Sequence, residues 1–113
     1  MGVARLDYVE FPVVDCATSK SFFEAAFGWS LAQFGPTYAS TTTGDVDIGL
    51  DSTPGETVAA PLAVIRVDDL KAARSDVIAA GGTLTRDIFA FPGGRRFHFR
   101  EPGGCELAVW VTE

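Results

Sequence analysis

The fold is decided by residues 13–28, VVDCATSKSFFEAAFG, in which Asp15 and Gly28 bracket a run of helix-forming residues. Asp15 suits a helix N-cap, because its carboxylate can accept hydrogen bonds from the exposed backbone N–H groups of the first turn. Gly28 suits the left-handed residue that ends a helix. The apolar stripe between them has helical spacing and consists of Phe22, Phe23, Ala26 and Phe27. The segment predicts an amphipathic helix between Asp15 and Gly28.

The same pattern returns 54 residues later in residues 67–82, VDDLKAARSDVIAAGG. Asp69 takes the place of Asp15, and Gly82 follows Asp69 at the distance at which Gly28 follows Asp15. One face of this second predicted helix carries Leu70, Ala73, Val77 and Ala80. Self-similarity at a fixed offset indicates that one structural unit occurs twice.

The remaining segments have the composition of strands. In the first half they lie near residues 7–13, 29–34, 37–43 and 45–50, and in the second half near 61–67, 83–90, 95–100 and 105–112. The predicted order is βαβββ, twice, which gives an α+β fold with a first module at 1–57 and a second at 58–113. Each half is about as small as an unaided fold can be, so we expect the two to share a core in one domain.

Composition and charge exclude several classes of partner. The chain has 113 residues and a net charge of −6, which disfavours nucleic acid and anionic membranes. No stretch approaches the roughly 20 apolar residues of a membrane-spanning helix, and the first residues lack a signal-peptide pattern. Two cysteines make no disulfide framework. These features predict a cytoplasmic protein.

The charge is uneven along the chain. Residues 1–57 hold eight acidic and two basic side chains, whereas residues 58–113 hold seven of each. One interpretation is a solvated acidic face. The other is electrostatic attraction for a cationic ligand or partner.

The paired pattern resembles the vicinal oxygen chelate superfamily, which includes glyoxalase I, extradiol dioxygenases, fosfomycin resistance enzymes and bleomycin-binding proteins. The likeness rests on the paired order of elements, on two V-x-D starts and on two further segments. These are Val13–Asp15, Val67–Asp69, FFEAAFGW at residues 22–29 and FREPGG at residues 99–104. The resemblance implies two modules whose sheets curl around a shared concave pocket. It also implies a homodimer and, in the enzymes, a divalent metal bound by His and Glu.

The metal-ligand pattern of that superfamily is not kept in this sequence. The resemblance places the ligands at Tyr8 and Leu62 on the first strands and at Ala108 and Ile48 on the last strands. Leu, Ala and Ile carry no donor atoms, and a neutral Tyr is a poor ligand for a hard divalent ion. We therefore expect no metal cofactor, with a divalent metal as the alternative.

Alternation along the predicted strands turns a set of aromatic and charged side chains toward the pocket. The set is Tyr8, Glu10, Arg66, His98, Glu106 and Trp110, with Trp29 at an edge. The carboxylates could instead pair with nearby arginines, Tyr8 and Trp110 could pack in a dimer interface, and His98 could be structural. A displaced metal site made of Glu10, His98 and Glu106 is a further alternative.

These residues favour a metal-free small-molecule-binding protein, which would sequester a toxic or aromatic compound between aromatic rings. The alternative is an enzyme of the same superfamily. It would be a lyase, isomerase or dioxygenase that uses a rearranged metal site, or His98 or a carboxylate as acid and base.

Overall fold

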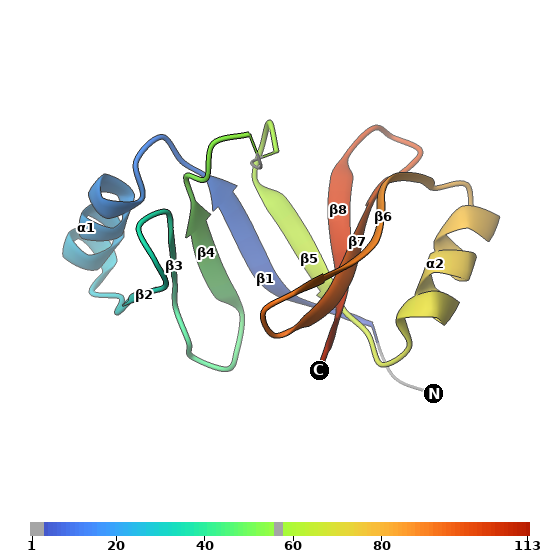
Figure 1. Ribbon diagram of the computed structural model, residues 1–113, viewed down its shortest axis with the longest axis horizontal. Coiled ribbons are helices and arrows are strands. Elements are labelled where there is room, and N and C mark those ends of the chain that lie inside the picture. The colour runs from blue at the N-terminus through green and yellow to red at the C-terminus, as the bar shows by residue number, and fades with distance from the viewer. Residues whose placement is uncertain (1–3, 56–57) are drawn as a thin grey trace. The chain divides into compact units, whose positions relative to one another are not determined.

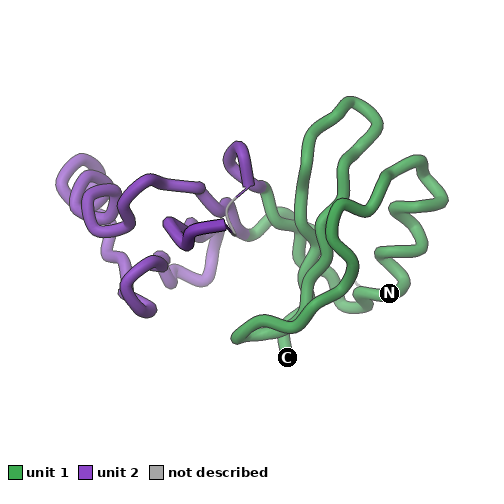
Figure 2. The backbone as a smooth tube through the Cα atoms, turned by 45° about the horizontal axis from the view of Figure 1, so that its top comes forward, with its two compact units in different colours: residues 1–7, 63–113 green, residues 8–62 purple. Residues whose placement is uncertain are grey.

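The computed structural model describes residues 4–55 and 58–113, and the chain divides into two units of dense internal contact (Figure 2). Unit 2 is Tyr8–Leu62, and unit 1 is the stretch from the N-terminus to Asp7 together with Ala63–Glu113. The predicted module boundary lies directly after residue 57, and residues 56–57 lie outside the described residues. That boundary stays a prediction.

The elements follow the predicted α+β order (Figure 1). The first part of the chain forms β1 (Arg5–Pro12), α1 (Cys16–Phe27), β2 (Ala32–Gln33), β3 (Tyr38–Ser40) and β4 (Asp47–Asp51). The second part forms β5 (Leu62–Arg66), α2 (Leu70–Ala79), β6 (Thr83–Phe91), β7 (Gly94–Arg100) and β8 (Glu106–Thr112). Both helices are confirmed. The first of the three strands predicted between α1 and the second module, near residues 29–34, is much shorter than expected, with only two residues.

Each unit has four strands in a mixed arrangement, if β1 is counted with unit 2 and β5 with unit 1, where most of their residues lie. In unit 2 the order is β2-β3-β4-β1, with β1 parallel to β4 and the other pairs antiparallel. In unit 1 the order is β5-β8-β7-β6, again with one parallel pair, β5 and β8. The helix α1 contacts β3 and β4, and α2 contacts β6, β7 and β8. Each helix therefore covers one face of its own unit's strands.

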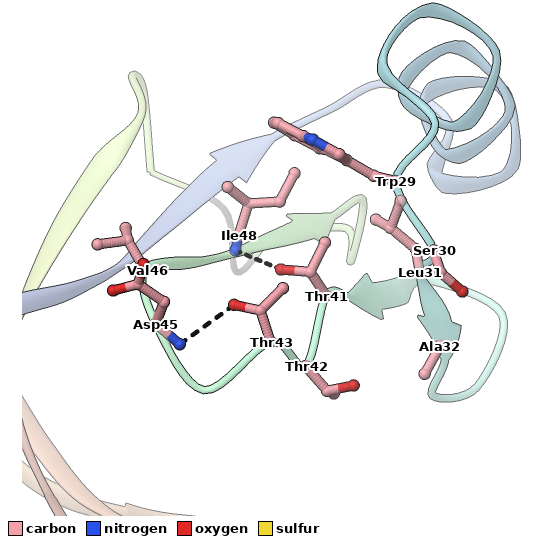
Figure 3. A pocket seen from close by; sticks show the side chains of 10 residues that line it. All are labelled: Trp29, Ser30, Leu31, Ala32, Thr41, Thr42, Thr43, Asp45, Val46 and Ile48. Atoms are coloured by element: carbon pink, nitrogen blue, oxygen red, sulfur yellow. Dashed lines mark hydrogen bonds between the residues drawn. The ribbon is translucent and has the colours of Figure 1, made fainter.

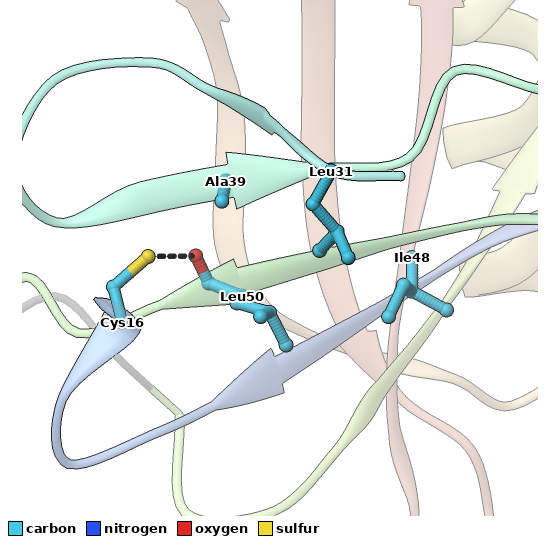
Figure 4. Close-up of a cluster of buried hydrophobic side chains, with 5 residues drawn as sticks. All are labelled: Cys16, Leu31, Ala39, Ile48 and Leu50. Carbon is cyan, nitrogen blue, oxygen red and sulfur yellow. Dashed lines mark hydrogen bonds between the residues drawn. The ribbon is translucent and has the colours of Figure 1, made fainter. Parts of the chain in front are cut away.

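The buried core of each unit lies under its helix, where the period-two pattern predicted it. In unit 2 the cluster consists of Cys16, Leu31, Ala39, Ile48 and Leu50 (Figure 4). The side chains of Val9, Phe11, Val13 and Phe23 pack against it. In unit 1 the cluster consists of Leu70, Phe97, Phe99 and Val109, with Ile65, Leu107 and Val111 among the side chains around it. Alternate residues of β1, β7 and β8 therefore point to the opposite faces.

The helix ends follow the sequence signals with one correction. Gly28 has a φ of 70°, and its N–H donates to the Glu24 carbonyl, as expected of a left-handed C-terminal residue. Asp69 accepts a hydrogen bond from the Ala72 N–H at 3.0 Å. Asp15 stands at the N-cap position, but its side chain makes no capping bond and instead accepts from the Thr18 hydroxyl. The predicted carboxylate cap at Asp15 is therefore wrong, because a nearby hydroxyl donor occupies it.

This difference between the helix starts predicts different mutational costs. Asp69→Ala is expected to lower the free energy of unfolding by about 1 kcal/mol, since it removes a capping acceptor. Asp15→Ala is expected to cost less than half as much, because no backbone N–H loses a partner. Urea unfolding of the two variants measures the contrast. Equal losses would contradict the assignment of the caps.

Neither helix in the described residues is long and apolar enough to cross a membrane.

Candidate functional site

The predicted site residues divide between the two units. Tyr8, Glu10 and Trp29 belong to unit 2, and Arg66, His98, Glu106 and Trp110 belong to unit 1. Phe97, Phe99, Leu107 and Val109 face α2, so their strand neighbours His98, Glu106 and Trp110 project from the face of unit 1 opposite α2.

Trp110 lies at the centre of that face and is held on several sides. Cross-strand pairing places Arg66 and Arg96 beside it on either flank. The Arg66 guanidinium carbon lies 5.1 Å from the centre of the indole ring, and the Phe91 ring lies 6.1 Å away. The indole N–H donates to a carboxylate oxygen of Asp7 at 3.0 Å. Because Asp7 is only 7% exposed, this bond fixes the ring orientation in a sheltered setting.

Two phenylalanines of β6 extend this aromatic surface and contact Arg96 and one further arginine, Arg86. The Arg86 guanidinium lies 3.6 Å from the centre of the Phe89 ring. Arg96 lies 5.5 Å from the same ring and 5.6 Å from the ring of Phe91. Sequence reasoning missed Phe89, Phe91, Arg86 and Asp7. The pairing of β6 with β7 shifts register between Leu84 and Arg86 and between Arg86 and Phe89, so simple alternation does not apply there.

His98 and Glu106 lie together on the same face. The His98 Nδ1 atom is 3.7 Å from the Glu106 Oε2 atom, and the Thr85 hydroxyl donates to that same oxygen at 2.6 Å. His98 is 4% exposed, and its ring lies 5.7 Å from the ring of Phe89. The carboxylate that Thr85 holds in place therefore lies close to the imidazole, but 3.7 Å is too long for a hydrogen bond between these two atoms.

Arginine side chains outnumber carboxylates on this face of unit 1. No carboxylate among the described residues forms an ion pair with Arg66 or Arg86, whereas Arg74 pairs with Asp87 and Arg95 with Glu113 elsewhere in the unit. Asp7 and Glu106 are engaged by Trp110 and Thr85. Guanidinium groups over ring faces can bind a carboxylate or phosphate and stack on aromatic groups. We name this surface, made of Arg66, Arg86, Phe89, Phe91, Arg96 and Trp110, the arginine–aromatic face.

Unit 2 brings Tyr8 and Glu10 together through Tyr38, a residue that sequence reasoning missed. The hydroxyls of Tyr8 and Tyr38 are hydrogen bonded, and the Tyr38 hydroxyl donates to the Glu10 carboxylate at 3.2 Å. Burial, and then the proximity of Tyr8 and Glu10, raise the pKa of Tyr38 far above its ordinary value. Tyr38 thus stays protonated, and its single proton is directed to Glu10. Tyr8 is then the donor to the Tyr38 oxygen.

Gly49 makes room for this hydroxyl pair. A Cβ atom at residue 49 would lie 2.2 Å from the Tyr8 hydroxyl oxygen and 2.3 Å from that of Tyr38. Cross-strand pairing places Gly49 directly opposite Glu10 and next to β3. The absence of a side chain at residue 49 therefore allows the two phenols to meet above the strand.

Trp29 lies on the other face of unit 2, beside α1. Its ring stacks on Phe23 with centroids 5.5 Å apart, and the Phe27 ring lies 5.3 Å away. Phe23 packs against the core under α1, on the face opposite Tyr8 and Glu10. Trp29 also lines a cavity of about 550 Å³ together with Leu31 and Ile48 of that core (Figure 3). Structure thus groups Trp29 with α1 and separates it from the tyrosine–glutamate chain.

The positions that the resemblance assigns to a metal do not fit one. Leu62 and Ala108 are buried aliphatic residues, and Ile48 belongs to the core under α1. Asp47, the cross-strand partner of Tyr8, has both oxygens occupied by donors from its own loop. Among residues 4–55 and 58–113, no three His, Cys, Asp or Glu side chains gather to hold an ion.

Comparison with solved structures shows the fold. A glyoxalase/bleomycin resistance protein/dioxygenase superfamily member from Vibrio splendidus 12B01 superposes with a TM-score of 0.69 at 17% identity, covering 98% of this chain and 100% of that one. A methylmalonyl-CoA epimerase from Mycobacterium tuberculosis gives 0.75 at 15% identity, covering 96% and 87%. The Mn(II)-bound glyoxalase from Novosphingobium aromaticivorans gives 0.69 at 21% identity, covering 96% of this chain and 40% of that one.

No curated protein matches the chain by sequence. A family model does match, and it spans residues 5–109, nearly the whole length. Together with the two helices and their four-stranded partners, this match is decisive for the family. The chain belongs to the Glyoxalase/Bleomycin resistance protein/Dioxygenase superfamily.

Proposed function

We propose that the protein is a small-molecule-binding member of its superfamily that works without a metal ion and sequesters an aromatic compound bearing a negative charge. The observation that carries this proposal is the arginine–aromatic face, where Trp110 is held by Asp7 and flanked by Arg66. A ring already fixed in place loses little conformational entropy when a second ring stacks on it. The missing donor groups at Leu62, Ala108 and Ile48 support the metal-free part.

The sign of the ligand charge follows from the local charges. Arg66 and Arg86 have no carboxylate partner among the described residues, so a carboxylate or sulfonate on the ligand would gain charge-assisted hydrogen bonds there. An aromatic cation would meet guanidinium groups of its own sign. The negative ligand charge proposed here is opposite to that of the cationic ligand that the acidic first half of the chain favours.

Isothermal titration of EDTA-treated protein with 2-naphthoate and with the uncharged 2-naphthamide tests the proposal. We expect 2-naphthoate to bind roughly tenfold more tightly, because the two probes differ in the charge that the arginines recognise. Binding that appears only after a divalent metal is restored would contradict the metal-free part. Equal affinities for the two probes would contradict the role of the arginines.

A second candidate is a metal-independent enzyme that moves a proton, such as an isomerase. The hydrogen-bonded chain from Tyr8 through Tyr38 to Glu10 favours it, since a carboxylate that phenol donors hold in place can take a proton from a carbon next to a carbonyl. One of the similar structures is an epimerase. Glu10→Gln removes this base, and His98→Ala removes the alternative one.

Incorporation of deuterium from D₂O into a carbonyl compound, measured for each variant, distinguishes Glu10 from His98 as the base. Loss of exchange in the Glu10 variant with retention in the His98 variant would assign the base to Glu10.

The metal-dependent lyase and dioxygenase alternatives are tested by elemental analysis of native protein, where one tightly bound transition metal per chain would favour them. We also propose the homodimer that the resemblance implies, which sedimentation equilibrium can measure.

A further inference from the structure

The cavity beside Trp29 in unit 2 is not part of the arginine–aromatic face. It has a volume of about 550 Å³ and is lined by Trp29, Ser30, Leu31, Ala32, Thr41, Thr42, Thr43, Asp45, Val46 and Ile48. All ten residues belong to unit 2. Leu31 and Ile48 of the core form an apolar base, while Trp29 remains 41% exposed. A volume of this size suits a small organic molecule.

The aromatic side of the cavity is held by α1. Trp29 stacks almost parallel on Phe23, with an interplanar angle of 4°, and also contacts Phe27. Figure 3 places Trp29 at one end of the cavity and Asp45 with Val46 at the other, with Ile48 between them. Since the indole ring is already packed on one side, it offers a fixed surface to a guest.

The polar side of the cavity is organised by Asp47, which itself does not line it. Partial burial opposes ionisation of Asp47, but donors from Thr43, Thr41 and Gly44 outweigh it and lower the pKa of the Asp47 carboxyl. The Asp47 Oδ1 atom accepts from the Thr41 hydroxyl at 2.7 Å and from the Thr43 hydroxyl at 2.8 Å. These bonds use the donor hydrogens of Thr41 and Thr43 and hold the loop that carries Asp45.

The carboxylate of Asp45 is the charged group of the cavity that can bind a ligand. Its backbone N–H donates to the Thr43 hydroxyl, but no donor among the described residues bonds its carboxylate. Among the described lining residues, Asp45 is the one with a charged side chain. The surrounding unit strengthens the same sign, because residues 8–62 hold seven acidic side chains and one Lys. The remaining residues of the chain hold eight of each sign.

We propose that this cavity is a second binding site, which takes a small organic cation such as a quaternary ammonium or an aromatic amine. Trp29 attracts the cation through its ring face, and the Asp45 carboxylate pairs with it. The negative field of unit 2 raises the local concentration of cations. This site is independent of the arginine–aromatic face, which selects the opposite charge.

The Trp110→Phe variant allows a direct test, because Trp29 is then the single tryptophan and the tryptophan fluorescence comes from it alone. The same substitution alters the central ring of the arginine–aromatic face. Titration with benzyltrimethylammonium is expected to change Trp29 fluorescence saturably, whereas benzenesulfonate leaves it unchanged. Asp45→Asn is expected to weaken binding about three- to fivefold, the range for one partly exposed ion pair. Asp45→Glu should restore most of the affinity, and high salt should weaken binding in the parent protein.

Asp15→Asn is the matched control. It removes the same charge from unit 2, while the Asn side chain keeps an oxygen that can accept from the Thr18 hydroxyl. Equal weakening by Asp15→Asn and Asp45→Asn would overturn the assignment of Asp45, and an unsaturable response would overturn the site. Shielding of Trp29 from acrylamide that disappears on dilution would assign the cavity to a second copy of the chain, and so also overturn it. None of these results depends on whether 2-naphthoate binds elsewhere.

Discussion

Phe97→Ala is expected to lower the free energy of unfolding by about 3–5 kcal/mol, the range for removing a large buried aromatic side chain. Phe97 is fully buried in the middle of β7, where Val109 of β8 is its cross-strand partner. Its ring lies 6.2 Å from that of Phe99, and both pack under α2 with Leu70. Strands on both sides keep the backbone in place, so little of the resulting cavity can collapse.

Phe22→Ala is the matched control for this prediction. It removes the same atoms from α1, but Phe22 is 59% exposed, so we expect a loss of under about 1 kcal/mol. Chemical denaturation followed by circular dichroism measures both variants. A similar loss for the two would mean that the core of unit 1 does not lie where Phe97 and Leu70 place it.

Trp110→Ala is expected to lower the affinity for 2-naphthoate at least about tenfold, because it removes the central ring of the arginine–aromatic face. Arg66→Gln should weaken 2-naphthoate binding by a similar factor but change 2-naphthamide binding little. The difference arises because Arg66 recognises the charge, while Trp110 contacts the aromatic body of both probes. Isothermal titration of each variant with both probes separates the two contributions.

Two control variants separate the loss of these contacts from a change in folding and from a general change in charge. Trp110→Phe keeps an aromatic ring but loses the N–H that bonds Asp7, so it should retain more affinity than the alanine variant. Arg74→Gln removes a positive charge from α2, where Arg74 pairs with Asp87, and should leave binding unchanged. If Arg74→Gln weakened 2-naphthoate binding as much as Arg66→Gln, a general charge effect would replace the proposed contact.

Local signals in the sequence were enough to predict the helices and the face of most strands. Both helices start after an Asp and end near a Gly, since capping chemistry depends on residues within one turn. Val9, Phe11 and Val13 face the core as their alternation predicted, and so do Phe97 and Phe99. The exception at Asp15 is also local: Thr18 offers a hydroxyl donor, and the carboxylate takes it in place of a backbone N–H.

Fewer of the contacts in the candidate site could be predicted from local sequence signals. Trp110 and Arg66 could be grouped from strand alternation, but Asp7 reaches the Trp110 indole from the far end of the sequence. Phe89 joins the arginine–aromatic face through shifted pairing that no local pattern reports. Tyr38 meets Tyr8 only because Gly49 leaves space for both hydroxyls.

The sequence by itself determined the element order, the approximate helix limits, the inward faces of most strands and the lack of donor groups at the expected metal positions. Those properties depend on residue chemistry, periodicity and neighbours along the chain. Only the tertiary structure decided which polar groups meet: Trp110 with Asp7, Tyr38 with Glu10, and Trp29 with the Asp45 loop around one cavity. The physical reason is that hydrogen bonds and ring contacts depend on distance in space, which strand register and side-chain packing set across separations that sequence patterns do not encode.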